Sequence, residues 1–156
     1  MKIKLLSVGK VRNEFIRQGE IEYIKRIQKF NPLQIDYVKE ERIIKTRKPS
    51  EIITAEGERL LKKIPPRSWV VAMDKNGTLF SSERFAQLVS GVMNKGTAYL
   101  LFIIGGTLGL SKTVKNKSHA VISLSKMTFT HEMTRLILLE QIYRSFTILK
   151  GKKYHK

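Results

Sequence analysis

The chain has 156 residues, with 30 Lys and Arg against 13 Asp and Glu, which gives a net charge of +17. This length predicts a single domain over residues 1–156 with a core of its own, and no apolar run approaches the ~20 residues of a membrane span. The absence of cysteine excludes disulfides and thiolate metal ligands, the 3 scattered histidines predict no metal site, and the strand-like opening is no signal peptide, so we expect a cytoplasmic protein.

The first half of the chain alternates strands with helices. The spacing of apolar residues predicts a strand at Ile3–Val8, a helix at Glu14–Phe30, a strand at Leu33–Tyr37, and a helix that Ser50 caps and that ends near Ile64. Residues 39–48 are highly charged and apolar only at Ile43 and Ile44. They predict a mobile surface loop that either faces RNA or is simply solvated.

The second half continues the same alternation. Its predicted elements are a strand at Trp69–Met73 closed by a turn at Asp74–Gly77, a helix that Ser81 or Ser82 caps and that ends near Asn94–Gly96, a strand at Tyr99–Ile104, a short helix at Ser111–Ser118, a strand at Ala120–Leu124, and a helix at His131–Leu149. This order of elements indicates an α/β fold, in which a mainly parallel sheet has helices on both faces.

A glycine-rich turn follows the most apolar predicted strand. Tyr99–Ile104 is apolar throughout, which is typical of a strand covered on both faces, and Gly105, Gly106 and Gly109 follow it. Ligands of open parallel sheets bind beyond the carboxyl ends of the strands, and glycine lets a ligand approach the main chain. A small-molecule site and a tight turn without a ligand fit this local pattern equally well. The spacing is not G-x-G-x-x-G, so a dinucleotide-binding fold is not supported.

Positive charge is concentrated in the second part of the chain. From Arg67 onward there are 14 basic and 4 acidic residues, whereas the residues before Arg67 include 16 basic and 9 acidic ones. Such an excess points to a polyanionic partner, nucleic acid before membrane. A lysine-rich surface that is merely solvated gives the same composition.

The last predicted helix carries apolar residues on two sides, which is more than packing against one sheet face requires. One side holds Met133, Leu136, Ile137 and Tyr143, and the other holds Leu138, Ile142, Phe146 and Leu149. A helix of this kind is either deeply buried or shared with a second subunit, and we favour a homodimer. On the same helix, Glu140 and Arg144 are four positions apart and can pair with each other.

Three segments together resemble one family of enzymes. They are Phe102–Leu110 with its glycines, Leu124–Phe129 followed by His131, and Glu140–Arg144 followed by Tyr154 and His155 at the end of the chain. In this order and at this spacing they resemble the ribosomal large subunit methyltransferase H family of the SPOUT methyltransferases. The opening Val8-Gly9-Lys10 matches as well, so the resemblance covers the whole chain.

The resemblance implies a fold and an activity. The α/β fold would contain a C-terminal trefoil knot of the SPOUT type, with the end of the chain threaded through a loop of the sheet. The methyl donor would be S-adenosyl-L-methionine, without a metal. The acceptor would be N3 of a pseudouridine in 23S rRNA of the assembled ribosome, and the enzyme would act as a homodimer. The alternative is a non-catalytic factor that binds ribosomes or rRNA with the same fold.

The same resemblance assigns residues to the site. The donor would be held by loops at strand ends, at Met73, Gly105, Leu124, Ser125, Lys126, Met127, Thr128 and Phe129. From the chemistry of methyl transfer we hypothesise in addition that Arg144 holds the substrate's phosphate or imide oxygens, and that His155 and Tyr154 assist loss of the N3 proton. For Arg144 the competing interpretation is an ion pair with Glu140, and for the tail it is a terminus without a catalytic role.

Two positions depart from the family's pattern. Thr130 stands where relatives often have proline, and its hydroxyl is expected to cap the last helix. Lys156 replaces a final arginine, which keeps the charge and loses a planar, two-pronged contact with phosphate. Other basic side chains are expected to contact phosphates without reading sequence: Lys10, Arg12, Lys112, Lys115, Lys117, Lys126, Lys152 and Lys153.

Overall fold

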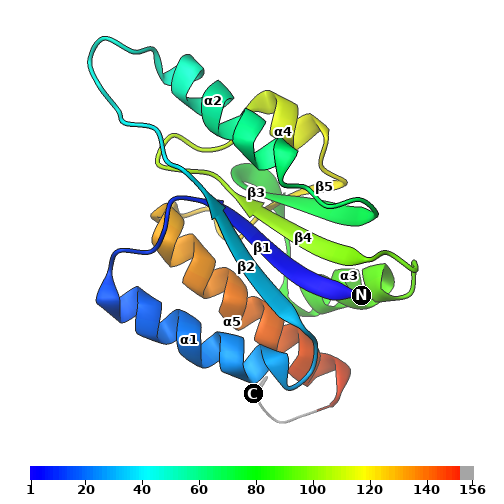
Figure 1. Cartoon of the computed structure of the whole chain (residues 1–156). Coiled ribbons are helices and arrows are strands. Elements are labelled where there is room, and N and C mark those ends of the chain that lie inside the picture. Colours follow the sequence, from blue (N-terminus) through cyan, green and yellow to red (C-terminus); the bar gives the residue numbers. More distant parts are fainter. Residues whose placement is uncertain (152–156) are drawn as a thin grey trace.

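Strands and helices alternate along the chain in the computed structural model, which describes residues 1–151 (Figure 1). The strands are β1 (Lys2–Val8), β2 (Leu33–Val38), β3 (Ser68–Leu79), β4 (Tyr99–Ile104) and β5 (Ala120–Ser123). The helices are α1 (Glu14–Gln28), α2 (Pro49–Lys62), α3 (Ser82–Met93), α4 (Lys112–Asn116) and α5 (His131–Leu149). Every strand and helix that the sequence predicts is therefore present.

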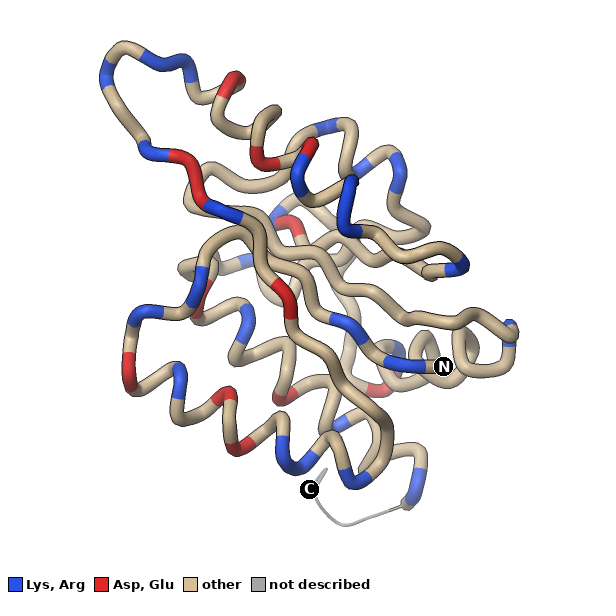
Figure 2. The backbone as a smooth tube through the Cα atoms, viewed as in Figure 1, with Lys and Arg blue, Asp and Glu red and all other residues tan. Residues whose placement is uncertain are grey.

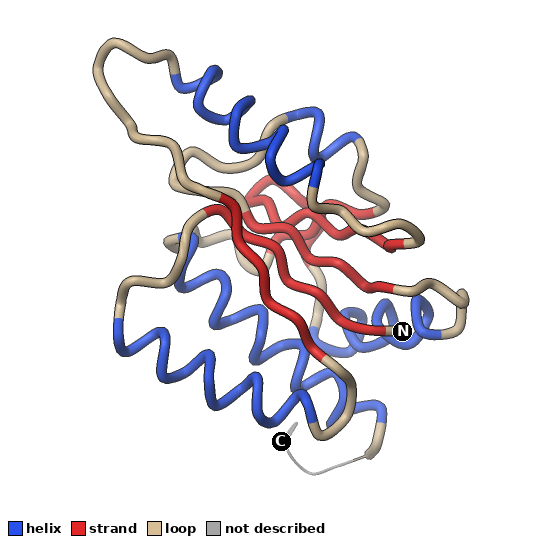
Figure 3. The backbone as a smooth tube through the Cα atoms, viewed as in Figure 1, coloured by secondary structure: helices blue, strands red, loops and turns tan. Residues whose placement is uncertain are grey.

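One five-stranded sheet forms the middle layer, with the strand order β2-β1-β4-β3-β5 and every neighbouring pair parallel. Helices α1, α3 and α5 cover one face, and α2 and α4 cover the other (Figures 1 and 3). The predicted α/β fold is confirmed, and the knot that the family resemblance implies stays a prediction. Within residues 1–151, no helix is long and apolar enough to cross a membrane.

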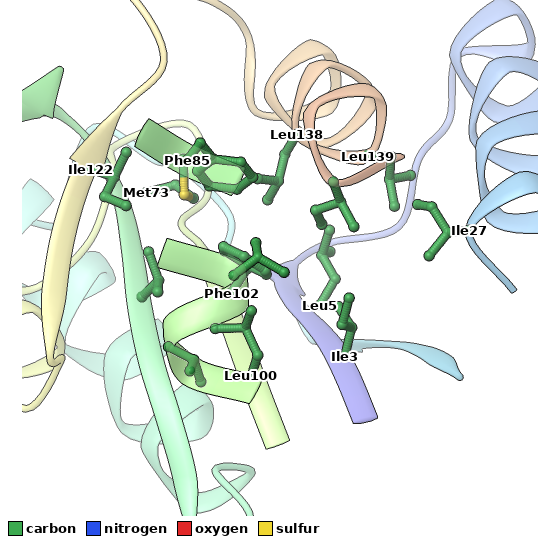
Figure 4. Close-up of a cluster of buried hydrophobic side chains, with 14 of the residues drawn as sticks. Ile3, Leu5, Ile27, Met73, Phe85, Leu100, Phe102, Ile122, Leu138 and Leu139 are labelled. Carbon is green, nitrogen blue, oxygen red and sulfur yellow. The ribbon is translucent and has the colours of Figure 1, made fainter. Parts of the chain in front are cut away.

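The side chains of β4 alternate between two hydrophobic cores. Phe102 faces the larger core, on the side of α1, α3 and α5, where it shares a cluster with Phe85 and Leu138 (Figure 4). The Phe85 and Phe102 ring centroids are 5.7 Å apart. The next residue, Ile103, faces the smaller core with Leu60 of α2. Burial on both faces explains why this strand is apolar throughout and fixes it at the centre of the sheet.

Helix α2 begins earlier than the sequence predicts. Its N-cap is Lys48, Pro49 is its first residue, and the Glu51 carboxylate accepts a hydrogen bond from the Lys48 backbone N–H at 3.3 Å. Ser50 therefore lies inside the first turn, and the prediction that it caps the helix is wrong. Proline is favoured at the first helical position because its fixed φ suits the helix and the N–H that it lacks would be unsatisfied there.

Strand β3 runs further than the sequence predicts, because Asp74–Gly77 is a bulge and the predicted turn is wrong. β3 pairs with β5 on both sides of this segment, with a shift in register between Met73 and Thr78. A Cβ atom at Gly77 would lie 2.6 Å from the carbonyl carbon of Ile122. Glycine at this position therefore allows the two strands to stay in close contact across the bulge.

Helix α5 lies between α1 and α3 (Figure 1). Leu136 packs against Gly19 of α1 so closely that a Cβ atom at Gly19 would lie 2.8 Å from the Leu136 Cδ1. The Tyr143 ring lies near Tyr23 and Phe30, with centroids 6.1 and 6.0 Å apart. Part of the side of α5 that holds Leu136 and Tyr143 is therefore used within the chain, and the homodimer stays a prediction.

A buried ion pair joins α5 to α1. The Arg135 Nε lies 2.8 Å from the Glu20 Oε1, and the two side chains are 6 and 7% exposed. The guanidinium also donates to the Ser7 Oγ at 3.1 Å and to the Gly9 carbonyl at 3.3 Å, at the end of β1. These extra bonds offset the desolvation of the pair, which the Coulomb attraction alone often does not repay. Arg135 thus ties α5, α1 and β1 together.

Replacing Arg135 with methionine is expected to destabilise the fold by about 3–5 kcal/mol, because the Glu20 carboxylate is left buried without its partner. The free energy of unfolding in urea measures this loss. Arg17→Met is the control, since Arg17 pairs with Glu14 in solvent and its removal should change little. A loss in Arg135→Met no larger than in the control would show that the buried pair does not hold α5 in place.

Candidate functional site

A hollow of about 700 Å³, which we call the edge hollow, opens at the carboxyl edge of the sheet. It is lined by residues 73–76, 104–110, 122–125 and 127–131, with Lys115 and Thr134. These segments meet because the parallel strands β3, β4 and β5 end at the same edge. The volume lies within the usual range of small-molecule sites.

The glycine turn after β4 forms one side of the edge hollow. The Gly109 N–H donates to the Gly106 carbonyl at 3.0 Å, which closes the turn. A Cβ atom at Gly105 would lie 2.5 Å from the carbonyl carbon and oxygen of Gly109, so any side chain at position 105 would displace the turn. Gly109 has a φ of +89°, a conformation that favours glycine. Bare backbone therefore borders the hollow, and a ligand can approach it closely.

The loop between β5 and α5 forms another side of the edge hollow and is shaped by its own hydroxyl groups. The Ser123 Oγ donates to the Ser125 carbonyl at 2.8 Å, and the Ser125 Oγ accepts from the Met127 N–H at 3.0 Å. The Thr130 Oγ1 accepts from the Met133 N–H at 3.2 Å, which confirms that Thr130 caps the last helix. Met127 is 76% exposed, so this loop presents apolar surface to solvent.

An ion pair beside the edge hollow joins the β3 bulge to α4. The Lys115 Nζ lies 3.1 Å from the Asp74 Oδ2, and the Asp74 side chain is only 10% exposed. Both residues line the hollow. The sequence places Asp74 in a turn and gives no signal for this pair, which arises because the strand continues through the bulge. Lys115, expected to contact phosphate, has its charge balanced by Asp74 in this structure.

Glu56 is a second residue that sequence reasoning misses, and it lies behind the glycine turn. It is 3% exposed, and its Oε1 accepts from the Glu41 N–H at 3.0 Å. Among the described residues its Oε2 has no hydrogen-bond partner, and it lies 2.9 Å from where a Cβ atom at Gly106 would stand. Burial raises the pKa of the Glu56 carboxyl above its ordinary value near 4.5, and neighbouring carboxylates add to this effect. The sequence offers one signal that Glu56 is buried, namely its spacing. Glu56 lies four residues from both Ile52 and Leu60, which are on the buried side of α2.

The residues that the family resemblance assigns to the donor lie together, with one exception. Those that line the edge hollow are Met73, Gly105, Leu124, Ser125, Met127, Thr128 and Phe129. Lys126 belongs to the same loop, is exposed and does not line the hollow. The binding of a methyl donor by these residues stays a prediction.

The predicted catalytic residues do not join this group within the described chain. Arg144 follows His131 by 13 residues along α5, which places it about 20 Å from the start of the helix. Its Nη2 lies 2.6 Å from the Glu140 Oε1, so the competing ion pair is present. Tyr154 and His155 lie outside the described residues. Within residues 1–151, no group of three or more His, Asp and Glu side chains could hold a metal ion.

Comparisons with known proteins relate both the sequence and the fold to methyltransferases. A family model described as predicted SPOUT methyltransferase matches residues 1–155. Two proteins named ribosomal RNA large subunit methyltransferase H, from Streptococcus mutans and Carboxydothermus hydrogenoformans, are 40% and 42% identical over 100% of both chains.

Solved structures show a likeness of fold. A probable methylase family protein from Haemophilus influenzae has a TM-score of 0.58 at 14% identity, covering 99% of this chain and 70% of its own. A probable methyltransferase from Bordetella pertussis has a TM-score of 0.57 at 10% identity, covering 92% of this chain and 95% of its own. At this identity the likeness concerns the fold alone.

The buried Glu56 carboxyl is expected to make the stability of the fold depend on pH. Because the pKa of Glu56 is higher in the folded than in the unfolded chain, its contribution to stability is present below about pH 4.5 and is lost as the pH rises through the folded pKa. Glu56→Gln should therefore become more stable relative to the native chain as the pH rises above about 4.5. Unfolding in urea at each pH measures the difference.

Glu58→Gln is the control for the Glu56 experiment, because it removes one negative charge from the exposed side of the same helix. If Glu56→Gln and Glu58→Gln followed the same pH dependence, the effect would come from net charge and not from the buried carboxyl.

Proposed function

The chain belongs to the SPOUT methyltransferase family, and within it to the ribosomal RNA large subunit methyltransferase H family, and from this premise we propose its reaction. We propose that it transfers the methyl group of S-adenosyl-L-methionine to N3 of a pseudouridine in 23S rRNA of the assembled ribosome, in the cytoplasm. The observation that carries the proposal is the edge hollow, where all the residues assigned to the donor except Lys126 lie together. The net charge of +17 supports an RNA substrate.

The lining of the edge hollow suits the proposed donor, which supplies a methyl group bound to a positively charged sulfur. Apolar side chains such as Met73 and Leu124 suit an adenine ring. The bare backbone at Gly105 leaves N–H and C=O groups open to polar edges of a ligand. Two lysines, Lys75 and Lys115, line the hollow. Lys115 is paired with Asp74, so the positive charge that would repel a cationic ligand is reduced there.

Methylation at N3 requires alignment of the two reactants and loss of the N3 proton. We propose that His155, assisted by Tyr154, accepts this proton. We also propose that Arg144 holds phosphate or imide oxygens of the substrate through charge-assisted hydrogen bonds. The Arg144 Nε and Nη2 donate to the Glu140 Oε1 at 2.9 and 2.6 Å, and this pair orients the guanidinium before substrate arrives.

Distances along α5 support a site shared between two copies of the chain. Leu149, at the end of α5, is about 27 Å from His131 at its start. An extended chain of the length between Leu149 and His155 spans at most about 21 Å, which is shorter than the helix. We therefore propose a homodimer in which Arg144 and the tail of one chain act in the edge hollow of the other. The exposed Met127 belongs to apolar surface that a second copy would cover.

The proposed reaction can be tested on ribosomes from cells that lack this gene, incubated with the purified protein and S-adenosyl-L-methionine. Mass spectrometry of nuclease fragments should find one new methyl group, on N3 of one pseudouridine of 23S rRNA. Gly105→Ala should reduce donor binding in calorimetry and methyl transfer at least tenfold, because its Cβ atom would displace Gly109.

Gly91→Ala is the matched control for Gly105→Ala. It lies in α3, where a Cβ atom would meet nothing within 4 Å, so donor binding and methyl transfer should stay at native levels. Absence of N3 methylation by the native protein on these ribosomes would overturn the proposed function.

A mixing experiment tests whether the site is shared. If Arg144 serves the hollow of the partner subunit, a dimer of one Arg144→Ala chain and one Gly105→Ala chain keeps one complete site. Random exchange of subunits gives about half mixed dimers, so methyl transfer should recover to roughly a quarter of the native rate. Each variant alone should stay strongly impaired, with the thermal stability of Arg144→Ala close to native. Lack of recovery would contradict the shared site, and a destabilised but active Arg144→Ala would assign Arg144 a structural role.

A further inference from the structure

A charged loop projects from the molecule between β2 and α2. This basic arm comprises residues 39–48 and extends beyond the helices that cover the sheet (Figure 1). It contains five Lys and Arg and two Glu, and Figure 2 shows the basic residues spread along its length. The residues that line the edge hollow do not include any part of the arm.

Ion pairs connect the base of the basic arm to the rest of the protein, and the mobility that the sequence predicts for this loop stays a prediction. Glu41 pairs with both Arg47 and Arg59, so one carboxylate links the two ends of the arm to α2. Glu40 pairs with Arg12 at 3.0 Å, which links the arm to the segment after β1. Both acidic residues of the arm are therefore engaged at its base, and their charges are balanced there.

The tip of the basic arm, residues 42–45, combines exposed apolar and basic side chains. Ile43 and Ile44 are 58 and 51% exposed. Arg42 and Lys45 flank them and are also exposed, and within residues 1–151 neither cation is in an ion pair. Two adjacent exposed isoleucines contribute nothing to the core, and unpaired cations beside them favour an anionic partner. This combination indicates a contact surface for another molecule.

The basic arm stands on the same edge of the sheet as the edge hollow. It begins at the carboxyl end of β2. This strand belongs to the same parallel sheet as β3, β4 and β5, whose carboxyl ends border the hollow. A chain of contacts connects the two places: the Glu41 N–H donates to Glu56, and the other carboxylate oxygen of Glu56 lies against Gly106 of the glycine turn. A large partner that covers the edge hollow therefore meets the arm along the same edge.

We propose that the basic arm is a second RNA contact, which holds rRNA at a distance from the base that is methylated. Arg42 and Lys45 bind phosphates, and Ile43 and Ile44 pack against exposed sugar or base faces, as apolar side chains beside cations do in other nucleic-acid complexes. RNA is favoured over a protein partner because the tip lacks acidic residues and the whole chain carries +17. The inference rests on the proposed function, which supplies the RNA substrate.

Two double variants separate the charged and apolar parts of the contact. Arg42→Ala with Lys45→Ala should weaken binding to large ribosomal subunits roughly tenfold and reduce the slope of log affinity against log salt by about 1 to 2. Ile43→Ser with Ile44→Ser should weaken binding and leave that slope unchanged, because it removes no charge. Both should raise the KM for ribosomes and leave donor binding at the native level.

Lys25→Ala with Lys29→Ala is the matched control, because it removes two exposed cations at the far end of α1. It should bind ribosomes like the native protein. A photo-crosslinking phenylalanine analogue in place of Ile43 identifies the partner directly, and the expected crosslink is to 23S rRNA.

Native-like binding by both arm variants would overturn the arm contact, and so would a crosslink to a ribosomal protein. Failure of the native protein to bind the donor or to methylate rRNA would instead count against the proposed function. The two failures are therefore distinguishable in the same set of measurements.

Discussion

The parallel pairing of β4 with β1 and β3 is the constraint on which the rest of the structure depends. Ile104, the last residue of β4, pairs with Ser7 of β1 and Met73 of β3, so the three strands reach the same level. The glycine turn and the β3 bulge are thereby brought to one edge, although they are far apart in the sequence. A slip of one residue would turn every β4 side chain toward the wrong core, and because both faces of β4 are buried this register is strongly specified.

A network of polar contacts fixes α5 relative to the sheet. Arg135 bonds to the Gly9 carbonyl, and Glu132, one turn earlier, accepts from the backbone N–H groups of Arg12 and Asn13 at 3.2 and 3.1 Å. The same helix begins directly after the loop that lines the edge hollow. Helix α5 therefore holds in place both the segment after β1 and the loop after β5. A buried charge suits this purpose because its directional bonds fix the geometry that apolar packing would leave adjustable.

Local spacing of apolar residues is enough to predict the strands, the helices and the glycine turn of this chain. Apart from the N-cap of α2, which lies two residues earlier than predicted, prediction fails where the outcome depends on a distant segment. The Asp74–Gly77 sequence has the composition of a turn, and only pairing with β5 makes it a bulge. The Asp74 and Lys115 partners are 41 residues apart, and Glu56 gains its place only when α2 packs behind Gly106. The glycine turn could thus be located from the sequence, while the charged groups around it could not.

The layout of the proposed site along α5 explains how methyl transfer would depend on assembly. The edge hollow lies at the start of the helix, and Arg144 lies about 20 Å further along, so a single chain would hold the proposed donor without presenting it to a base. Exposed Met127 leaves the loop of that hollow open to water, which a transfer site must exclude. A second copy would supply the distant cation and cover the loop in one step. In the proposed dimer, positive charge would retain RNA without reading its sequence, and the shape of the completed pair would select the base. Control of this kind would require no conformational switch inside the chain, because the proposed reacting groups would be separated until two chains meet.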